Sequence, residues 1–230
     1  MTAGSTEINI AYGNNLAAKS DYENGTKVFL AFDDFETDLS RWEFTNPNAW
    51  SLSSSATVFG QYGLAHNGDD QWAKYIGKIN VTSLQIQAFC SKNEKGNYVG
   101  IALYSYWSEA TRSGYTFVFR HNQEDSDPNE IYLIRVDNGT TTGLVHKQLS
   151  DLYPNTPYKL VLIKRGNILT GKIYDKSGNL IGSVNTSDAT YSNIVGVGFA
   201  VHSVASYHDN FIATSLSDPA DFGTPQLVSR

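Results

Sequence analysis

Three aspartates in strand-like sequence are the first residues of this chain whose chemistry needs an explanation. Asp33 and Asp34 interrupt the run VFLAFDDFETDLSRWEF, where a buried strand would keep valine or phenylalanine. Asp209 repeats the pattern near the other end of the chain, in SYHDNFIAT. Calcium prefers oxygen ligands and relieves repulsion between clustered carboxylates, so one interpretation is a calcium site. The alternative is a polar strand edge that begins a turn, with Asp209 hydrogen-bonded to a neighbouring loop.

A second set of residues that could form a binding site lies in the run YVGIALYSYW. Strict alternation predicts that its aliphatic side chains face a core and that Tyr104 and Tyr106 share the opposite face. Tyrosine rings stack on the C–H faces of pyranose rings, while amides and arginines reach the sugar hydroxyls. This run therefore predicts the aromatic wall of a sugar-binding face.

Polar side chains from neighbouring runs, and one tryptophan near a strand end, complete this predicted ligand-binding face: Gln87, Trp107, Arg120 and Arg135. The alternative is ordinary packing on an exposed sheet, because tyrosine and arginine pairs stabilise sheets without any ligand.

The elements that must position these residues are strands. The chain has 230 residues, 14 Tyr, 11 Phe and 19 Gly, a composition that favours strands and turns. About a dozen runs alternate with a period of two, and turn sequences such as DKSGN separate them. We therefore expect an all-β protein, a two-sheet antiparallel β-sandwich.

The charge and the cysteine content exclude several classes of function. The net charge is −6, and lysine and arginine are scattered, so a nucleic-acid partner is not expected. The single cysteine excludes an intrachain disulfide and any metal site of several cysteines. No apolar run approaches the length of a membrane span, so membrane insertion is not expected.

Several motifs resemble known families. The segment INIAYGNNLAAKSDYENGTKVFLAFDDFE is similar to a junction in prokaryotic surface and secreted proteins, where a domain of unknown function hands over to a lectin-like sandwich. The following residues resemble the concanavalin A-like lectin/glucanase superfamily, in its laminin G-like group, a jelly-roll fold. The matching motifs are DDF…W, YVGIALYS, YKLVLIKRGNILTGKIYDKSGNLIGS and VGVGFAVHSVASYHDNFIAT.

The resemblance implies a domain organisation and a metal. Residues 1–25 would be the remnant strand and linker of an upstream domain, 26–214 the sandwich, and 215–230 a tail or linker. In this superfamily the first and last strands lie side by side, and a structural calcium ion is often bound by an aspartate of the last strand. Asp209 matches that position, and Asp33 or Asp34 would add a carboxylate from the first strand.

Catalysis finds little support in the sequence. Glycoside hydrolases of this fold carry alternating carboxylates, as in E-x-D-x-E, so that both sides of the scissile bond face an acid. This chain has no such run. A discontinuous catalytic pair on different strands stays open, as does a polysaccharide lyase.

The sequence thus predicts a non-catalytic carbohydrate-binding or adhesion module of a larger extracellular or cell-surface protein, with a polysaccharide or glycan as its partner. The alternatives are a glycosidase or lyase of the same fold, and a structural spacer or protein-binding module. The oligomeric state and the glycan are not specified by the sequence.

Overall fold

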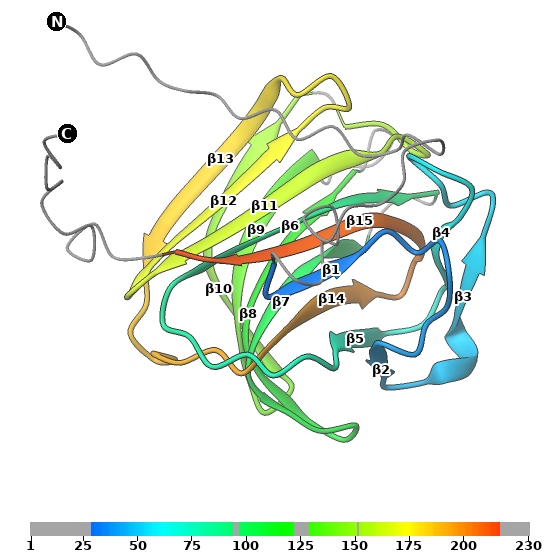
Figure 1. Ribbon diagram of the computed structural model, residues 1–230. Coiled ribbons are helices and arrows are strands. Elements are labelled where there is room, and N and C mark those ends of the chain that lie inside the picture. The colour runs from blue at the N-terminus through cyan, green and yellow to red at the C-terminus, as the bar shows by residue number, and fades with distance from the viewer. Residues whose placement is uncertain (1–28, 94–96, 122–128, 151, 217–230) are drawn as a thin grey trace, which may run out of the picture.

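The computed structural model describes residues 29–216 except 94–96, 122–128 and 151. In this part of the chain two antiparallel β-sheets pack face to face (Figure 1). Sheet A contains β1 (Ala31–Asp33), β3 (Trp50–Ser53), β4 (Gly63–Asn67), β6 (Leu84–Lys92), β11 (Tyr158–Arg165), β12 (Ile168–Tyr174), β13 (Leu180–Ser187) and β15 (Ala205–Ser215). Sheet B contains β2 (Trp42–Phe44), β5 (Gln71–Tyr75), β7 (Tyr98–Trp107), β8 (Arg112–Arg120), β9 (Asn129–Asp137), β10 (Thr140–Leu149) and β14 (Gly196–His202). The 3-10 helix η1 (Pro47–Ala49) leads into β3. The predicted all-β sandwich is confirmed.

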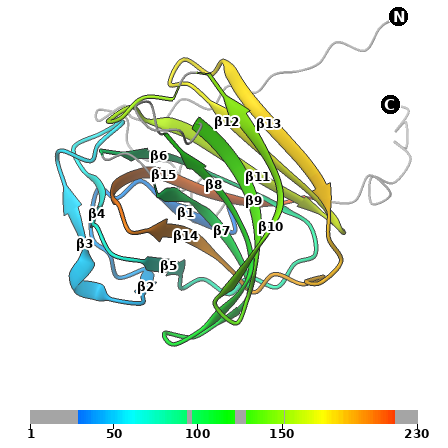
Figure 2. The same ribbon diagram turned by 180° about the vertical axis from the view of Figure 1, so that it is seen from behind.

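The strand order brings the two ends of the sandwich together. Sheet A runs β13-β12-β11-β6-β15-β4-β3, and β1 also pairs with β15. In that pairing Asp33 lies opposite Phe211, so the implied contact between the first and last strands is confirmed. Sheet B runs β10-β9-β8-β7-β14-β5-β2 and faces the viewer in Figure 2.

Alternating side chains build the core between the sheets. In β6 the residues Leu84, Ile86, Ala88 and Cys90 are buried, while the residues between them along most of the strand are partly exposed. Burial raises the pKa of the Cys90 thiol above its usual range, so this cysteine is an inert core residue.

Asp33 is a structural residue that anchors an aromatic cluster. Its Oδ2 accepts a hydrogen bond from Trp42 Nε1 at 2.8 Å, and its Oδ1 accepts one from the backbone N–H of Phe35 at 2.8 Å. Phe35 is fully buried with φ at 58°, a left-handed conformation that is strained for an aromatic residue. The Trp42 ring stacks on Phe199 with ring centroids 5.2 Å apart. One carboxylate therefore fixes a strained turn and the orientation of a core indole.

We expect Asp33→Ala to lower the free energy of unfolding by about 2–4 kcal/mol, because two buried donors lose their acceptor. Asp34→Ala is the matched control, since Asp34 is half-buried and adjacent. Urea unfolding monitored by tryptophan fluorescence measures both variants. Equal and small losses in the two variants would contradict the structural role of Asp33.

Some expectations fall outside the described residues or were incomplete. The predicted upstream strand and linker at 1–25 and residues 217–230 of the predicted tail at 215–230 lie outside the described residues, whereas Ser215 ends β15. Strand β10 was not predicted, because most of its side chains are exposed and it forms the edge of sheet B, so it carries no apolar alternation.

Candidate functional site

A β-bulge in β7 sets the direction of the residues that sequence analysis singled out. Tyr104 pairs with Gly114 of β8, Tyr106 pairs with Ser113, and the register shifts at Ser105. Gly114 and Ser113 face opposite sides of the sheet, so their partners do as well. The prediction that Tyr104 and Tyr106 share one face is therefore wrong, because an extra residue reverses the alternation.

Tyr106 lines a cleft at the end of sheet B. Its side chain is 51% exposed, and the cleft has a volume of about 420 Å³. The β7–β8 strand ends, the β9–β10 turn and the loop before β14 supply its lining: Ser105, Tyr106, Ser113, Asn138, Thr190, Tyr191, Ser192 and Asn193. Every lining side chain is uncharged, and together they offer amides, hydroxyls and two phenol rings. We call this set the Tyr106 cleft.

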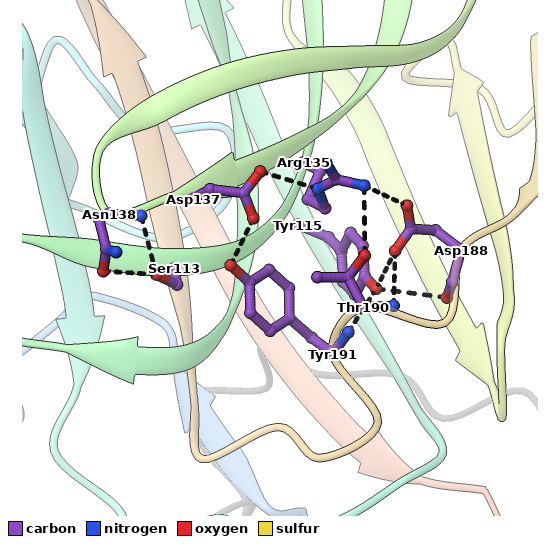
Figure 3. Close-up of polar contacts among 8 residues, drawn as sticks. All are labelled: Ser113, Tyr115, Arg135, Asp137, Asn138, Asp188, Thr190 and Tyr191. Atoms are coloured by element: carbon purple, nitrogen blue, oxygen red, sulfur yellow. Dashed lines mark hydrogen bonds and ion pairs between the residues drawn. The ribbon is translucent and has the colours of Figure 1, made fainter.

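A network of ion pairs behind the Tyr106 cleft holds its two sides together (Figure 3). Arg135 Nε donates to Asp137 Oδ2 at 2.8 Å, and Arg135 Nη1 donates to Asp188 Oδ2 at 2.8 Å. Arg135 and Asp137 belong to β9 in sheet B, whereas Asp188 follows β13 of sheet A. The guanidinium therefore ties the loop before β14 to the end of sheet B.

Hydrogen bonds extend this network to the cleft lining. Tyr191 Oη donates to Asp137 Oδ1 at 2.5 Å, and the Tyr191 backbone N–H donates to Tyr115 Oη at 3.0 Å. The backbone N–H of Thr190 donates to Asp188 Oδ1 at 2.9 Å, which closes an Asx turn. Two lining residues are thus fixed before any ligand arrives.

The β9–β10 turn positions an amide on the other side of the cleft. Asn138 has φ of 50° and Gly139 has φ of 84°, as a tight hairpin turn requires. The backbone N–H of Asn138 donates to Ser113 Oγ at 3.0 Å, so the turn is attached to β8.

The pKa values of Asp188 and Arg135 show that both groups of this network stay ionised at neutral pH. Burial alone raises the pKa of Asp188, but hydrogen bonds from Thr190, Tyr115 and Arg135 outweigh it and lower that pKa to about 2. The bond to Asp137, followed by the bond to Asp188, raises the pKa of Arg135. Salt-bridged carboxylates at a loop of this kind stay ionised well into the acid range.

The other predicted ligand-binding residues lie in different places. Tyr104 is 1% exposed, and its Oη donates to the backbone oxygens of Ala73 and Phe199. Its side chain is therefore a buried structural group on the outer face of sheet B. Trp107 lies on the same face as Tyr104, with ring centroids 4.8 Å apart.

The other three predicted residues lie away from Tyr104 and Trp107. Arg120 lies at the opposite end of β8, where it forms an ion pair with Glu130 and covers the ring of Tyr98. Arg135 pairs across the strand with buried Tyr115 and serves the network behind the cleft. Gln87 belongs to β6 of sheet A, a different sheet, because alternation alone does not tell which sheet a strand joins.

Two of the three predicted metal ligands, Asp33 and Asp209, accept hydrogen bonds from N–H groups. Both oxygens of Asp33 accept N–H donors, as described above. Asp209 Oδ2 accepts the backbone N–H groups of Val58 and Phe59 at 2.7 and 2.9 Å, and Oδ1 accepts that of Asn210 at 2.7 Å. In the part of the chain that the structure describes, no three His, Cys, Asp or Glu side chains lie close enough together to hold a metal ion between them.

These donors do not fit calcium. Calcium requires oxygen ligands, whereas the loop around Val58 presents positive N–H dipoles to the carboxylate. Glu36 Oε1 accepts two further backbone N–H groups of the same loop, those of Gln61 and Tyr62. Burial raises the pKa of Asp209 to about 6, since its hydrogen bonds offset only part of the desolvation. Asp209 and Glu36 therefore hold the loop as hydrogen-bond acceptors, which is the alternative that the sequence had left open.

Sequence analysis missed most of the Tyr106 cleft. Its loop residues come from the run SDATYSN, which shows no alternation and carries only a turn signal. The sequence DNG at 137–139 carries a turn signal, but nothing in it shows that the turn contributes an amide to a site.

Comparison with known proteins identifies the class of fold. The two sheets form the jelly-roll sandwich of concanavalin A-like and galectin-like lectins and carbohydrate-binding domains. Carbohydrate-binding module CBM66 from Bacillus subtilis is similar at 16% identity and a TM-score of 0.55, with 76% of this chain and 96% of that chain covered. A Lotus tetragonolobus seed lectin is similar at 12% identity and a TM-score of 0.56, covering 83% and 98%.

A third similar structure is the exoplasmic/lumenal domain of VIP36 in its Ca²⁺/Man3GlcNAc-bound form. Its identity is 10% and its TM-score 0.56, with 85% of this chain and 93% of that chain covered. Residues 1–59 match the family described as a domain of unknown function, DUF2341, as the resemblance of the N-terminal segment predicted. The match continues into the sandwich through β1, β2 and β3. No curated protein matches the chain.

We expect the contribution of Asp188 to stability to depend on pH. Its folded pKa of about 2 lies below the ordinary value of 3.8, so the stabilisation is present above about pH 4 and is lost as pH falls through 2. Urea unfolding of the natural protein and of Asp188→Asn at several pH values measures this. The difference between the two proteins should shrink steadily on acidification, and a constant difference would contradict the assignment.

Proposed function

We propose that this protein is a non-catalytic carbohydrate-binding module of a larger extracellular protein, and that the Tyr106 cleft holds a glycan. The observation that carries the proposal is an exposed tyrosine beside an open cleft of neutral amides and hydroxyls, on a lectin-like sandwich. The similar structures described as a carbohydrate-binding module and a lectin support it.

The chemistry of the cleft suits a neutral sugar ring. The exposed face of Tyr106 offers a plane for the C–H groups of a pyranose. The side chains of Asn138 and Asn193 offer both donors and acceptors for hydroxyl groups. The network behind the cleft fixes Thr190 and Tyr191 in advance, which reduces the entropy lost on binding.

The placement outside the cell belongs to the same proposal. It is supported by one similar structure, which is described as an exoplasmic/lumenal domain. Across the described residues, no helix is long and apolar enough to cross a membrane.

A catalytic role finds its strongest candidate in Glu130 on the outer face of sheet B. This carboxylate is 2% exposed, forms an ion pair with Arg120 and accepts a hydrogen bond from Tyr98 Oη at 3.1 Å. A buried carboxylate engaged by a guanidinium has little access to a substrate, so this cluster favours a structural role.

Glycan binding is expected to depend on Tyr106. Screening on a glycan array identifies a ligand, and isothermal titration then measures its affinity for the natural protein and for Tyr106→Ala. Loss of the stacking plane should weaken binding roughly tenfold, which corresponds to about 1.4 kcal/mol. Tyr62→Ala is the control, because Tyr62 is 41% exposed and does not line the cleft. Equal affinity of the two variants for the ligand would refute the placement of the site.

The calcium ion that the resemblance implies near Asp209 stays a prediction, and the N–H donors around that carboxylate favour a junction without metal. We expect the midpoint of thermal unfolding to be the same with calcium and with excess chelator, because a ligand that binds only the folded state would raise it. A midpoint that falls in chelator and recovers when calcium is restored would establish the metal instead.

A further inference from the structure

A second group of aromatic residues lies on the outer face of sheet B, at the same end as the Tyr106 cleft. Trp72 of β5, together with Tyr104 and Trp107 of β7, packs over the small residues Ala102 and Ala200. The rings of Trp72 and Tyr104 lie 6.3 Å apart, and those of Tyr104 and Trp107 lie 4.8 Å apart. Tyr104 is buried, whereas both tryptophans are partly exposed, so the tryptophans form the accessible surface.

Arg112 completes this group and brings a charge that has no direct carboxylate partner among the described residues. It pairs across the strand with Trp107, and its Cζ lies 4.4 Å from the centre of the Trp72 ring. Within the described residues no carboxylate lies within ion-pair distance of it, and its Nε is buried without a hydrogen-bond partner. By contrast, Arg120 and Arg135 each have carboxylate partners.

The acid that acts on Arg112 from a distance is engaged elsewhere. Asp70 Oδ1 accepts a hydrogen bond from Ser203 Oγ at 2.6 Å and lies 2.7 Å from His202 Nδ1. Burial lowers the pKa of Arg112, and Tyr104 and Asp70 counteract this only in part. The guanidinium therefore bears a desolvation cost that an anionic ligand would offset.

The chemistry of the group specifies the kind of anion. A guanidinium presents a planar fork of N–H donors that matches a carboxylate, and tryptophan planes stack on the C–H faces of a sugar ring. A pyranose that carries a carboxylate satisfies both at once. The Tyr104 hydroxyl is already bound to backbone oxygens, so it holds the floor and does not compete for the ligand.

We propose that Arg112, Trp72 and Trp107 form a second subsite that binds a uronic acid residue, with the guanidinium, which lies over the Trp72 ring, on its carboxylate and the Trp107 indole on its ring. This inference rests on the proposed function, because it names the class of sugar. The β7–β8 strand ends separate the subsite from the Tyr106 cleft. One acidic oligosaccharide that reaches both therefore contacts the charged Arg112 with one sugar and the neutral side chains of the Tyr106 cleft with another.

The test compares an oligogalacturonate with its carboxyl-reduced, neutral form in isothermal titrations at low and high salt. The natural protein should bind the acidic form at least roughly tenfold more tightly, because a charge-assisted hydrogen bond is at stake, and added salt should reduce that preference. Arg112→Gln should abolish the preference, and Arg112→Lys should keep only part of it, because lysine lacks the fork. Arg165→Gln, at an exposed arginine on sheet A, is the control and should leave the preference unchanged.

The outcomes separate this inference from the proposed function. Equal binding of both oligosaccharides, with a loss of affinity in Tyr106→Ala, would overturn the uronate subsite and leave glycan binding intact. An acidic preference that survives in Arg112→Gln would also overturn it. Absence of binding to any glycan, on the array or in the titrations, would overturn both. Equal binding of the acidic and neutral forms by the natural protein would overturn the uronate subsite even where a variant fails to fold.

Discussion

A single extra residue in β7 determines what the end of this sandwich presents to a ligand. The bulge at Ser105 turns Tyr106 toward the loop before β14 and leaves Tyr104 and Trp107 on the outer face of sheet B. An uninterrupted strand would place Tyr106 on the same face as Tyr104 and leave the cleft without its exposed ring. Two different surfaces therefore arise from four consecutive residues of one strand.

Polar side chains at the ends and edges of the sheets hold neighbouring segments in place. Arg135 connects the loop before β14 to β9, Asp33 orients the core indole of Trp42, and Asp209 accepts backbone N–H groups of the loop around Val58. Each is a charge with directed hydrogen-bond partners, as burial requires. Arg112 departs from this pattern, and that departure singles it out as a binding residue.

The sequence predicted the fold because apolar alternation marks every long strand that has one buried face. The run LQIQAFC became β6, and EIYLIRVD became most of β9. Apolar alternation does not reveal strand β10, because an edge strand with mostly exposed side chains has no apolar period. Adjacency of the first and last strands came from the resemblance and was confirmed by the pairing of β1 with β15.

The candidate site was only partly accessible from the sequence. Tyr106 and Trp107 were named, but a bulge leaves no mark in SYW that would show the change of face, and the partners of Tyr106 come from a loop more than 80 residues away. Arg135 was read as a ligand contact because sequence does not show its bonds to Asp137 and Asp188. The paired aspartates suggested a metal, whereas hydrogen bonds to Phe35 and Trp42 explain Asp33.

The most direct test of the central claim is an amide NMR titration of the assigned natural protein with the glycan that an array identifies. The account predicts that the largest shifts fall on Tyr106, Asn138 and residues 190–193, around the Tyr106 cleft. Shifts confined to the second small pocket, which Ser55, Val58 and Tyr207 help to line, would contradict it.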